Sequence, residues 1–361
     1  MARGSNTRAL IVGLAVVLGT ISMACGGGGT SNASVPPVAA GSLSSPAQAP
    51  SASPSPTTGA TPAIRTTPTK RFLVSTFDVA EPEGFATGFG SVWIPGHHSE
   101  TITRIDAATN QVVAEIEGVG YQAQDVAVGA GSVWVPASGA DYIARIDPET
   151  NTIVSRLKVG AVSDVDFGFE SLWAATKDMR LLRVDPRTER VLATIQIGPK
   201  GPNDCNNTPL VTARWVWVSV CDTGTAVQVD PHTNRVARTL GLGANLGATP
   251  GSNAVASDDG LWVAFDSPSV IVRLDPDSGK VLDQATVDGA RVGGNFMAVD
   301  RGTLWLGGPG IVTGFDAKSL EVTATYQATT YAEVHPGVGF GSLWVTSYDL
   351  SEVLRFDLPG A

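Results

Sequence analysis

The chain has 361 residues, with 34 acidic and 24 basic side chains and a formal net charge of −10. A nucleic-acid-binding domain needs a basic face, so this balance argues against a nucleic-acid partner. An acidic domain suits cationic ligands or metal ions better. The three cysteines lack the CxxC spacing of common zinc sites, which argues against structural zinc.

Residues 1–24 predict a secretion signal. Arg3 and Arg8 precede an apolar stretch over residues 9–21, which is too short to span a bilayer as a mature helix. The stretch ends at Ser22-Met23-Ala24-Cys25 and four glycines follow. This junction resembles the lipobox of bacterial lipoproteins, although serine replaces the usual leucine at position 22. The resemblance implies that Cys25 is lipidated and anchors the protein to the outer face of the cell membrane, with plain secretion as the alternative.

Residues 26–70 consist mainly of Ser, Thr, Pro, Ala and Gly, with almost no charge. Such a composition cannot bury enough apolar surface to become ordered. Residues 25–70 are therefore expected to be a lipidated cysteine followed by a disordered tether, with a root-mean-square span of about 35 to 40 Å for a random coil.

Residues 71–361 contain two short phrases that recur seven times. The first is typified by Gly-Ser-Val-Trp-Ile at 90–94, and the second by Arg-Ile-Asp-Ala-Ala-Thr-Asn at 104–110. The tryptophans of the first phrase recur about every 42 residues, a period typical of propeller blades. They are Trp93, Trp134, Trp173, Trp217, Trp262, Trp305 and Trp344.

Each repeat contains four strand-like runs. In the second repeat they cover residues 124–128, 132–136, 142–147 and 152–159. The second run is apolar at nearly every position, which indicates a strand buried on both faces, as in sheets stacked around a ring. No repeat shows a helical apolar period. The pattern predicts an all-β, seven-bladed propeller with four-stranded blades.

The last repeat ends after its third run, whereas residues 71–79 form a strand-like run outside any repeat. We expect this N-terminal run to supply the outer strand of the seventh blade. That arrangement closes the ring and removes two exposed strand edges.

Seven aspartates recur at fixed spacing, which invites a metal or catalytic interpretation. Most are followed by turn residues, as in Asp-Pro-Glu-Thr-Asn at 147–151, where aspartate opens a type I turn and proline presets the next φ. A structural role in hairpins is therefore expected for Asp106, Asp147, Asp185, Asp230, Asp275, Asp316 and Asp357.

Cys205 and Cys221 flank the first two strands of the fourth repeat. Neighbouring antiparallel strands place both cysteines at the same end of the blade, so we expect a disulfide in an oxidising compartment. Two free, buried thiols are the alternative.

The position nine residues before each tryptophan marks the entry of the inner strand into the channel. These positions are Gly84, Asp125, Asp164, Thr208, Asn253, Phe296 and His335, with Asn295 beside Phe296. A polar ring at one depth suits a ligand or ion site, and solvation of a water-filled channel is the alternative. The candidate ligand-binding residues are Asp125, Asp164, Asn253, Asn295 and His335.

Histidines at two places in the sequence are candidates for catalysis or metal binding. His335 shares the channel face with carboxylates and could act as a general base or metal ligand, or could simply line the channel. His97 and His98 are adjacent in a loop, and their side chains are expected to point apart, which argues against joint ligation of a metal.

The repeated phrases resemble those of the YVTN and virginiamycin B lyase-like propeller superfamily. The resemblance covers Arg71 to Asp357 and implies the propeller fold. The lyase of that group opens streptogramin B antibiotics by elimination with Mg²⁺ on the channel axis. His335 matches its inner-strand histidine, whereas Ser347 occupies the position of its glutamate.

The expected function is binding of a small molecule, a glycan or an envelope protein at the channel face of a membrane-anchored monomer. One alternative is a metal-assisted lyase or hydrolase, with His335 as its base and Mg²⁺ as its cofactor. The other is a structural envelope scaffold without a site.

Lipidation can be tested directly. Cells expressing the wild-type chain should incorporate labelled fatty acid into it, and the Cys25→Ala variant should lose that label. Incorporation that is unchanged by the substitution would show that Cys25 is not the anchor.

Overall fold

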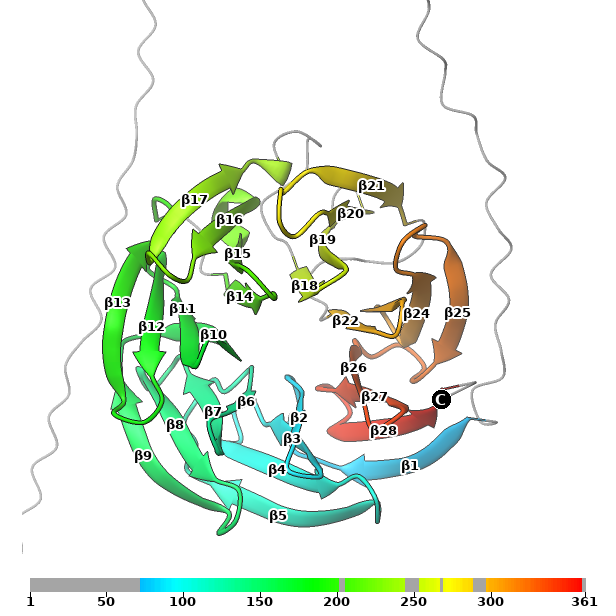
Figure 1. The fold of residues 1–361 in the computed structure, drawn as a ribbon. Coiled ribbons are helices and arrows are strands. Elements are labelled where there is room, and N and C mark those ends of the chain that lie inside the picture. Colours follow the sequence, from blue (N-terminus) through cyan, green and yellow to red (C-terminus); the bar gives the residue numbers. More distant parts are fainter. Residues whose placement is uncertain (1–71, 201–204, 244–252, 267–268, 288–296, 359–361) are drawn as a thin grey trace, which may run out of the picture. The chain divides into compact units, whose positions relative to one another are not determined.

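The computed structural model describes residues 72–200, 205–243, 253–266, 269–287 and 297–358. These residues form seven four-stranded antiparallel sheets arranged around a central channel (Figure 1). The predicted propeller is confirmed. The predicted signal segment, Cys25, the tether and Asn295 lie outside the described residues. No helix in the described part of the chain is both long and apolar enough to cross a membrane.

In every blade the strands follow one another from the channel to the outer edge. From inside to outside, blade 1 contains β2 (Ala86–Gly88), β3 (Ser91–Pro95), β4 (Thr101–Asp106) and β5 (Gln111–Glu117). Blade 2 contains β6 (Ala127–Gly129), β7 (Ser132–Ala137), β8 (Tyr142–Asp147) and β9 (Thr152–Lys158). Blade 3 contains β10 (Val162–Gly168), β11 (Ser171–Thr176), β12 (Arg180–Asp185) and β13 (Arg190–Gln196).

Blade 4 contains β14 (Asn207–Val211), β15 (Val216–Val220), β16 (Thr225–Asp230) and β17 (Arg235–Leu240), with the short 3₁₀ turn η2 (Cys221–Thr223) after β15. Blade 5 contains β18 (Asn253–Ser257), β19 (Gly260–Asp266), β20 (Ser269–Leu274) and β21 (Val281–Thr286). Blade 6 contains β22 (Met297–Asp300), β23 (Thr303–Gly307), β24 (Ile311–Asp316) and β25 (Val322–Gln327). Blade 7 contains β26 (His335–Gly339), β27 (Ser342–Ser347), β28 (Glu352–Asp357) and β1 (Leu73–Asp78).

The N-terminal strand closes the ring, as predicted. β1 pairs antiparallel with β28, from Leu73 opposite Phe356 to Asp78 opposite Glu352, and the two strands lie side by side in Figure 1. Because β1 and β28 belong to one sheet, blade 7 can come apart only if these two strands separate from each other.

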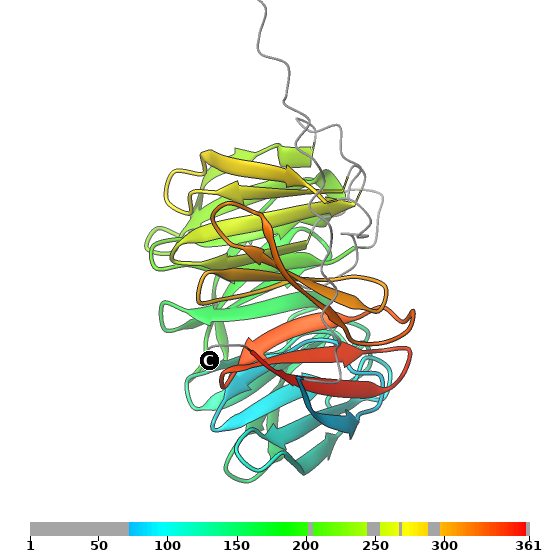
Figure 2. The ribbon, with the colours of Figure 1, turned by 90° about the vertical axis from the view of Figure 1, so that its right-hand side faces the viewer.

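The register defines two faces of the propeller. In blade 3, Val162 at the start of β10 pairs with Thr176 at the end of β11, while Gly168 pairs with Ser171 at the tight hairpin. Each inner strand therefore starts at the same end as the loop between the second and third strands. We call this end the mouth face. Figure 2 shows the blades edge-on, with loops projecting at both ends of the strands.

The second strands form the core. The second-strand tryptophans are at most 4% exposed, and β3, β7, β11 and β27 are buried at every position. The prediction of burial on both faces is thus correct, because each sheet is packed between two others. At about 25 cal/mol per Å² of apolar area, this repeated burial is the main term that favours folding.

An arginine in the third strand links each of several blades to the next one. The Arg104 guanidinium lies 4.8 Å from the centroid of the Trp93 ring. Its Nε donates to Ser91 Oγ at 2.8 Å, and its Nη1 donates to Pro148 O and Asn151 Oδ1 in the hairpin of blade 2. We call this arrangement the interblade clamp. Arg183 and Arg355 make equivalent contacts, and Arg355 reaches Ala107 and Asn110 of blade 1 across the ring closure.

The residue at the arginine position of the clamp differs in blades 4 and 6. In blade 4, Gln228 replaces the arginine and donates to Pro276 O and Asp277 O. In blade 6 the position is Gly314, where a Cβ would lie 2.8 Å from the Trp305 ring. The next blade is completed by the N-terminal β1 and so has no hairpin between its third and fourth strands. An arginine in blade 6 would therefore have no turn to bind.

Six of the seven repeated aspartates have the structural role in hairpins that was expected, and Asp357 does not. The turn aspartates of blades 1 to 6 accept backbone N–H groups of their own hairpins. In the hairpin of blade 2, the N–H of Glu149 donates to Asp147 Oδ1 at 2.8 Å, and this bond is the main reason that the Asp147 pKa is lowered. The seventh, Asp357, ends β28, where the chain makes no hairpin to a fourth strand.

Removal of one clamp should destabilise the domain. We expect Arg104→Ala to lower the free energy of unfolding by about 2 kcal/mol, because charge-assisted hydrogen bonds and a ring contact are lost together. Arg104→Lys should not restore it, since lysine lacks the planar fork. Chemical denaturation of the variants checks this, with the exposed Arg187→Ala as control. Equal stability of Arg104→Ala and Arg187→Ala would contradict the clamp.

Candidate ligand site at the mouth of the channel

A cavity of about 500 Å³ opens among the inner strands. This volume lies within the usual range of small-molecule sites. Its polar lining among the described residues comes from six of the seven blades and comprises Glu83, Gln124, Asp125, Asp164, Asp166, Asn206, Thr208, Asn253 and His335. The described lining contains no lysine or arginine. The cavity is therefore rich in acceptors and carboxyl groups.

The structure brings four of the five predicted binding residues together. Asp125, Asp164, Asn253 and His335 all line the cavity, whereas Asn295 lies outside the described residues. Their role in binding remains a prediction. Glycine at position 84 of the ring is explained by packing, because a Cβ there would lie 2.4 Å from the carbonyl oxygen of Gln124 in the next blade.

The channel carboxylates join neighbouring inner strands. Asp125 of blade 2 accepts from the N–H of Val165 in blade 3 at 2.9 Å. Asp164 of blade 3 accepts from the Thr208 hydroxyl at 2.5 Å, and Asp166 accepts from the N–H of Val211 at 2.7 Å. Both of these donors belong to blade 4. Each acid thus satisfies a donor of the following blade near the channel axis.

Burial changes the protonation of these acids. Burial raises the pKa of Asp164 to about 7, and the nearby Glu83 carboxylate acts in the same direction. Burial also raises the pKa of Asp166 to about 6 and that of Asp125 well above its ordinary value, with repulsion from Asp164 as the second cause for Asp125. Burial therefore moves the pKa values of Asp164 and Asp166 toward neutral pH. Only 4% of Asp164 is exposed, and its Oδ1 is buried without a hydrogen-bond partner among the described residues.

His335 lies at the start of β26, opposite Thr346 of β27, and is 7% exposed. Burial lowers its pKa, while Glu83 and Asp349 act in the opposite direction. Lowering the pKa below its ordinary value of about 6.5 keeps the imidazole neutral at pH 7. A neutral imidazole can accept a proton or a hydrogen bond from a ligand.

The described residues contain no cluster of metal-binding side chains. Mg²⁺ requires near-octahedral oxygen ligation, commonly through one or two carboxylates and water. No group of three or more His, Cys, Asp or Glu side chains in the described ranges is placed to hold a metal ion. Ser347, at the position where the resemblance implies glutamate, is fully buried and offers a hydroxyl rather than a carboxylate.

Four ring side chains meet on the mouth face: His97, His98, Tyr121 and Tyr348. We call them the aromatic group. The His97 and His98 rings stack with centroids 4.0 Å apart, and Tyr121 lies 5.0 Å from His98. The expectation that the two histidines point apart is therefore wrong. Contacts from other segments align them: Glu83 Oε1 lies 3.3 Å from His97 Nδ1, and the Tyr348 hydroxyl lies 2.8 Å from His98 Nδ1.

Several of these residues escaped sequence reasoning. Asp166 follows Asp164 by two residues in β10, and alternate residues of a strand share a face, so that spacing could have identified it. Glu83 carries no such signal, and the loop positions of the four aromatic-group residues do not reveal that their rings pack together. They come from loops of blades 7, 1 and 2 that meet only in the folded ring.

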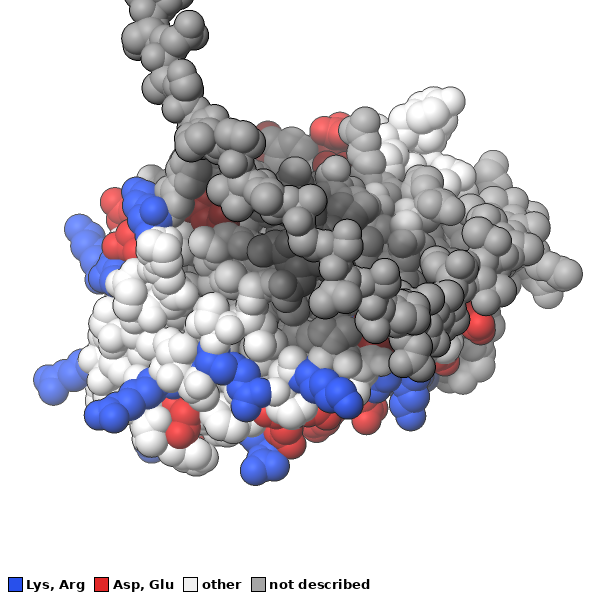
Figure 3. All heavy atoms as spheres, turned by 90° about the horizontal axis from the view of Figure 1, so that it is seen from above, with Lys and Arg blue, Asp and Glu red and all other residues white. Residues whose placement is uncertain are grey.

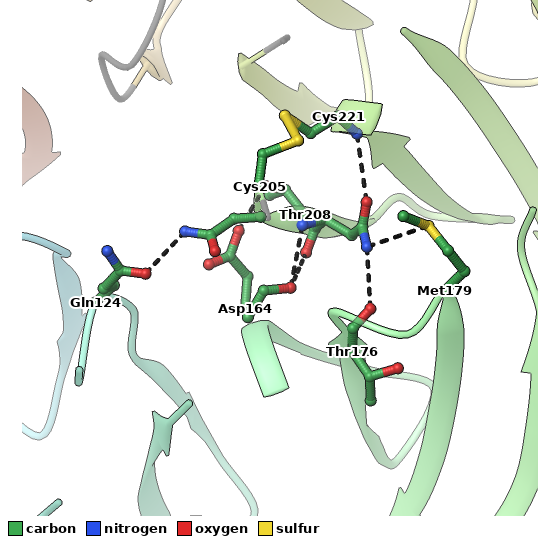
Figure 4. Close-up of a disulfide and its surroundings, with 10 residues drawn as sticks. Gln124, Asp164, Thr176, Met179, Cys205, Thr208 and Cys221 are labelled. Atoms are coloured by element: carbon green, nitrogen blue, oxygen red, sulfur yellow. Dashed lines mark hydrogen bonds between the residues drawn. A yellow bond between two sulfur atoms is a disulfide. The ribbon is translucent and has the colours of Figure 1, made fainter. Parts of the chain in front are cut away.

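The predicted disulfide is present between Cys205 and Cys221, and both cysteines line the cavity (Figure 4). It fixes the entry of β14, where Asn206 donates to Gln124 Oε1 at 2.9 Å and Asn207 donates to Thr176 O at 3.0 Å. A cross-link between residues 16 apart stabilises the fold by about 3 kcal/mol in the chain-entropy account. The disulfide therefore holds one wall of the site.

No family model and no curated protein matches this chain. Solved structures do match. Hydrazine synthase of Kuenenia stuttgartiensis superposes with a TM-score of 0.67 at 13% identity, covering 84% of this chain and 100% of its own. A streptogramin B lyase superposes with a TM-score of 0.65 at 16% identity, covering 80% of this chain and 96% of its own.

Virginiamycin B lyase from Staphylococcus aureus also superposes with a TM-score of 0.65 at 14% identity, covering 79% of this chain and 98% of its own. At these identities the similarity establishes a common seven-bladed propeller architecture. The activities of those proteins do not carry over to this chain on that basis.

Replacement of Asp164 by asparagine should change the pH dependence of stability. A folded-state pKa of about 7 against an unfolded value near 3.9 means that the folded state binds the extra proton, so stability falls as pH rises through this window. Between about pH 4 and pH 7, the free energy of unfolding of Asp164→Asn should therefore decrease less than that of the wild type, by roughly 1 to 4 kcal/mol. Denaturation at several pH values measures it, with the exposed Asp141→Asn as control. Identical slopes in wild type and Asp164→Asn would contradict the assignment.

Proposed function

We propose that this protein binds a small ligand in the mouth of its channel. The observation that carries the proposal is Asp164, which lines the cavity and has a buried carboxylate oxygen with no hydrogen-bond partner among the described residues. An unsatisfied buried acceptor costs about 1 to 3 kcal/mol, and a ligand donor or cation would offset that cost. His335 and Asn253 line the same cavity and offer further polar contacts.

We further propose that the binding domain is displayed outside the cell membrane by a lipid on Cys25 and the tether of residues 25–70. The lipobox-like junction supports this location, and so does the Cys205–Cys221 disulfide, because disulfides persist mainly in oxidising compartments. The cavity volume favours a small molecule over the alternatives of a glycan chain or an envelope protein.

A second candidate is elimination or hydrolysis with His335 as the general base. One observation favours it, the buried and neutral imidazole in the cavity wall. The same site lacks the carboxylate at position 347, and its described residues contain no cluster of three or more His, Cys, Asp or Glu side chains that could hold a metal ion. Binding therefore accounts for more of the site than catalysis does.

A thermal-shift screen with charged, neutral and sugar compounds tests the proposal. Some compounds should raise the melting temperature of the wild type but not that of His335→Ala, since His335 lines the cavity. His232→Ala serves as the control, because His232 is exposed in a hairpin on the opposite face. A screen in which no compound stabilises the folded wild type would overturn the proposal.

The same protein should be incubated with a streptogramin B antibiotic and Mg²⁺ and followed by chromatography. A linear product formed by the wild type but not by His335→Ala would favour the lyase alternative. Unchanged antibiotic would remove it.

A further inference from the structure

We infer that the ligand is a small organic cation, such as a quaternary ammonium compound, whose charge lies between the channel carboxylates and the aromatic group. The inference rests on the proposed binding function and specifies the chemical class of its ligand. It is carried by the composition of the cavity, the rings at its mouth and the glutamate that joins the two.

The charge of the cavity is one-sided. Its described lining contains Glu83, Asp125, Asp164 and Asp166 but no lysine or arginine. Lys177 stabilises the Asp164 charge, although it lies outside the lining. An anion would add to the repulsion that these carboxyl groups already experience, whereas a cation would reduce it.

On the part of the outer surface shown in Figure 3, Lys and Arg side chains lie among Asp and Glu side chains. The cavity differs from that part of the surface, because its described lining holds carboxyl groups but no lysine or arginine. Burial and mutual repulsion raise the pKa values of these acids, and a bound cation would favour their ionised forms.

The rings at the mouth provide the second half of the site. Tyr121 is 44% exposed although it contacts His98, so it presents ring surface to the solvent. Tyr348 meets His97 and His98 edge-on, at centroid distances of 5.8 and 6.1 Å. Burial and the surrounding carboxylates raise the Tyr348 pKa, so its ring stays an uncharged phenol. Tyrosine faces attract cations, and groups of such rings recognise quaternary ammonium ligands.

Glu83 connects the two halves. Its carboxylate lines the cavity and acts on Asp164 and His335 within it. The same carboxylate lies 3.3 Å from His97 in the aromatic group. A cation beside Glu83 would thus be within reach of both the carboxylates and the rings.

An organic cation also fits better than a metal ion. A metal needs several converging donors at bonding distance, and the described residues provide no such group. A quaternary ammonium group needs no direct ligand bonds. It gains its free energy from ring faces and diffuse negative charge, and the mouth of the channel offers both.

Isothermal titration of the full chain in detergent provides the test, with choline and its uncharged isostere 3,3-dimethyl-1-butanol as probes. We expect choline to bind at least about tenfold more tightly than the alcohol. The double variant Tyr121→Ala/Tyr348→Ala should lose most of that difference, whereas Tyr121→Phe should keep it because the ring remains. His232→Ala, which removes a ring on the opposite face, should bind choline as the wild type does.

The outcomes separate this inference from the proposed function. Equal binding of choline and the alcohol would overturn the cation and leave the binding site intact. If neither probe binds while another compound of the screen gives a His335-dependent shift, the cation fails and the proposed function stands. If nothing in the screen binds, both fail. Choline binding that survives the double tyrosine variant would place the cation elsewhere and overturn the inference.

Discussion

In blades 1, 3 and 7, a third-strand arginine, a second-strand tryptophan and the hairpin of the next blade form the contact that joins neighbouring blades. The tryptophan fills the space between two sheets, and the arginine covers its ring while binding carbonyl and amide oxygens of the neighbouring turn. A single phrase of sequence therefore specifies both the interior of its own blade and the position of the next. Arg355 extends this contact from blade 7 to blade 1, so hydrogen bonds as well as the β1–β28 pairing hold the ring closed.

The channel differs from the space between the blades. Between the blades, the buried side chains are mainly apolar. Along the axis, carboxyl groups are buried beside one another, and burial raises their pKa values. Asp125, Asp164 and Asp166 still bind donors of the next blade, which provides a structural reason for part of the ring. The Asp164 oxygen that lacks a hydrogen-bond partner among the described residues is the part that stability does not explain.

The site is also asymmetric around a nearly symmetric ring. Blade 3 supplies Asp164 and Asp166, and blade 4 supplies the disulfide that borders the cavity. The aromatic group and Glu83 lie on the side formed by blades 7, 1 and 2. The seven-fold repeat thus serves as a scaffold, and departures from the repeat at these blades create the chemistry. The solved propellers share this fold at only 13 to 16% identity. Their similarity therefore gives no information about the ligand of this protein.

The sequence by itself determined the seven blades, the closing strand, the structural aspartates and the Cys205–Cys221 pair, because each depends on a local phrase or on spacing within one blade. It also located Asp125, Asp164, Asn253 and His335 on the channel wall, since inner-strand entries recur at a fixed distance from the tryptophans. Only the tertiary structure decided that His97 and His98 stack, that Glu83 joins the mouth to the cavity, and that Gly314 lacks a turn to clamp. These features depend on side chains from different blades, and no local pattern records which segments meet when the ring closes.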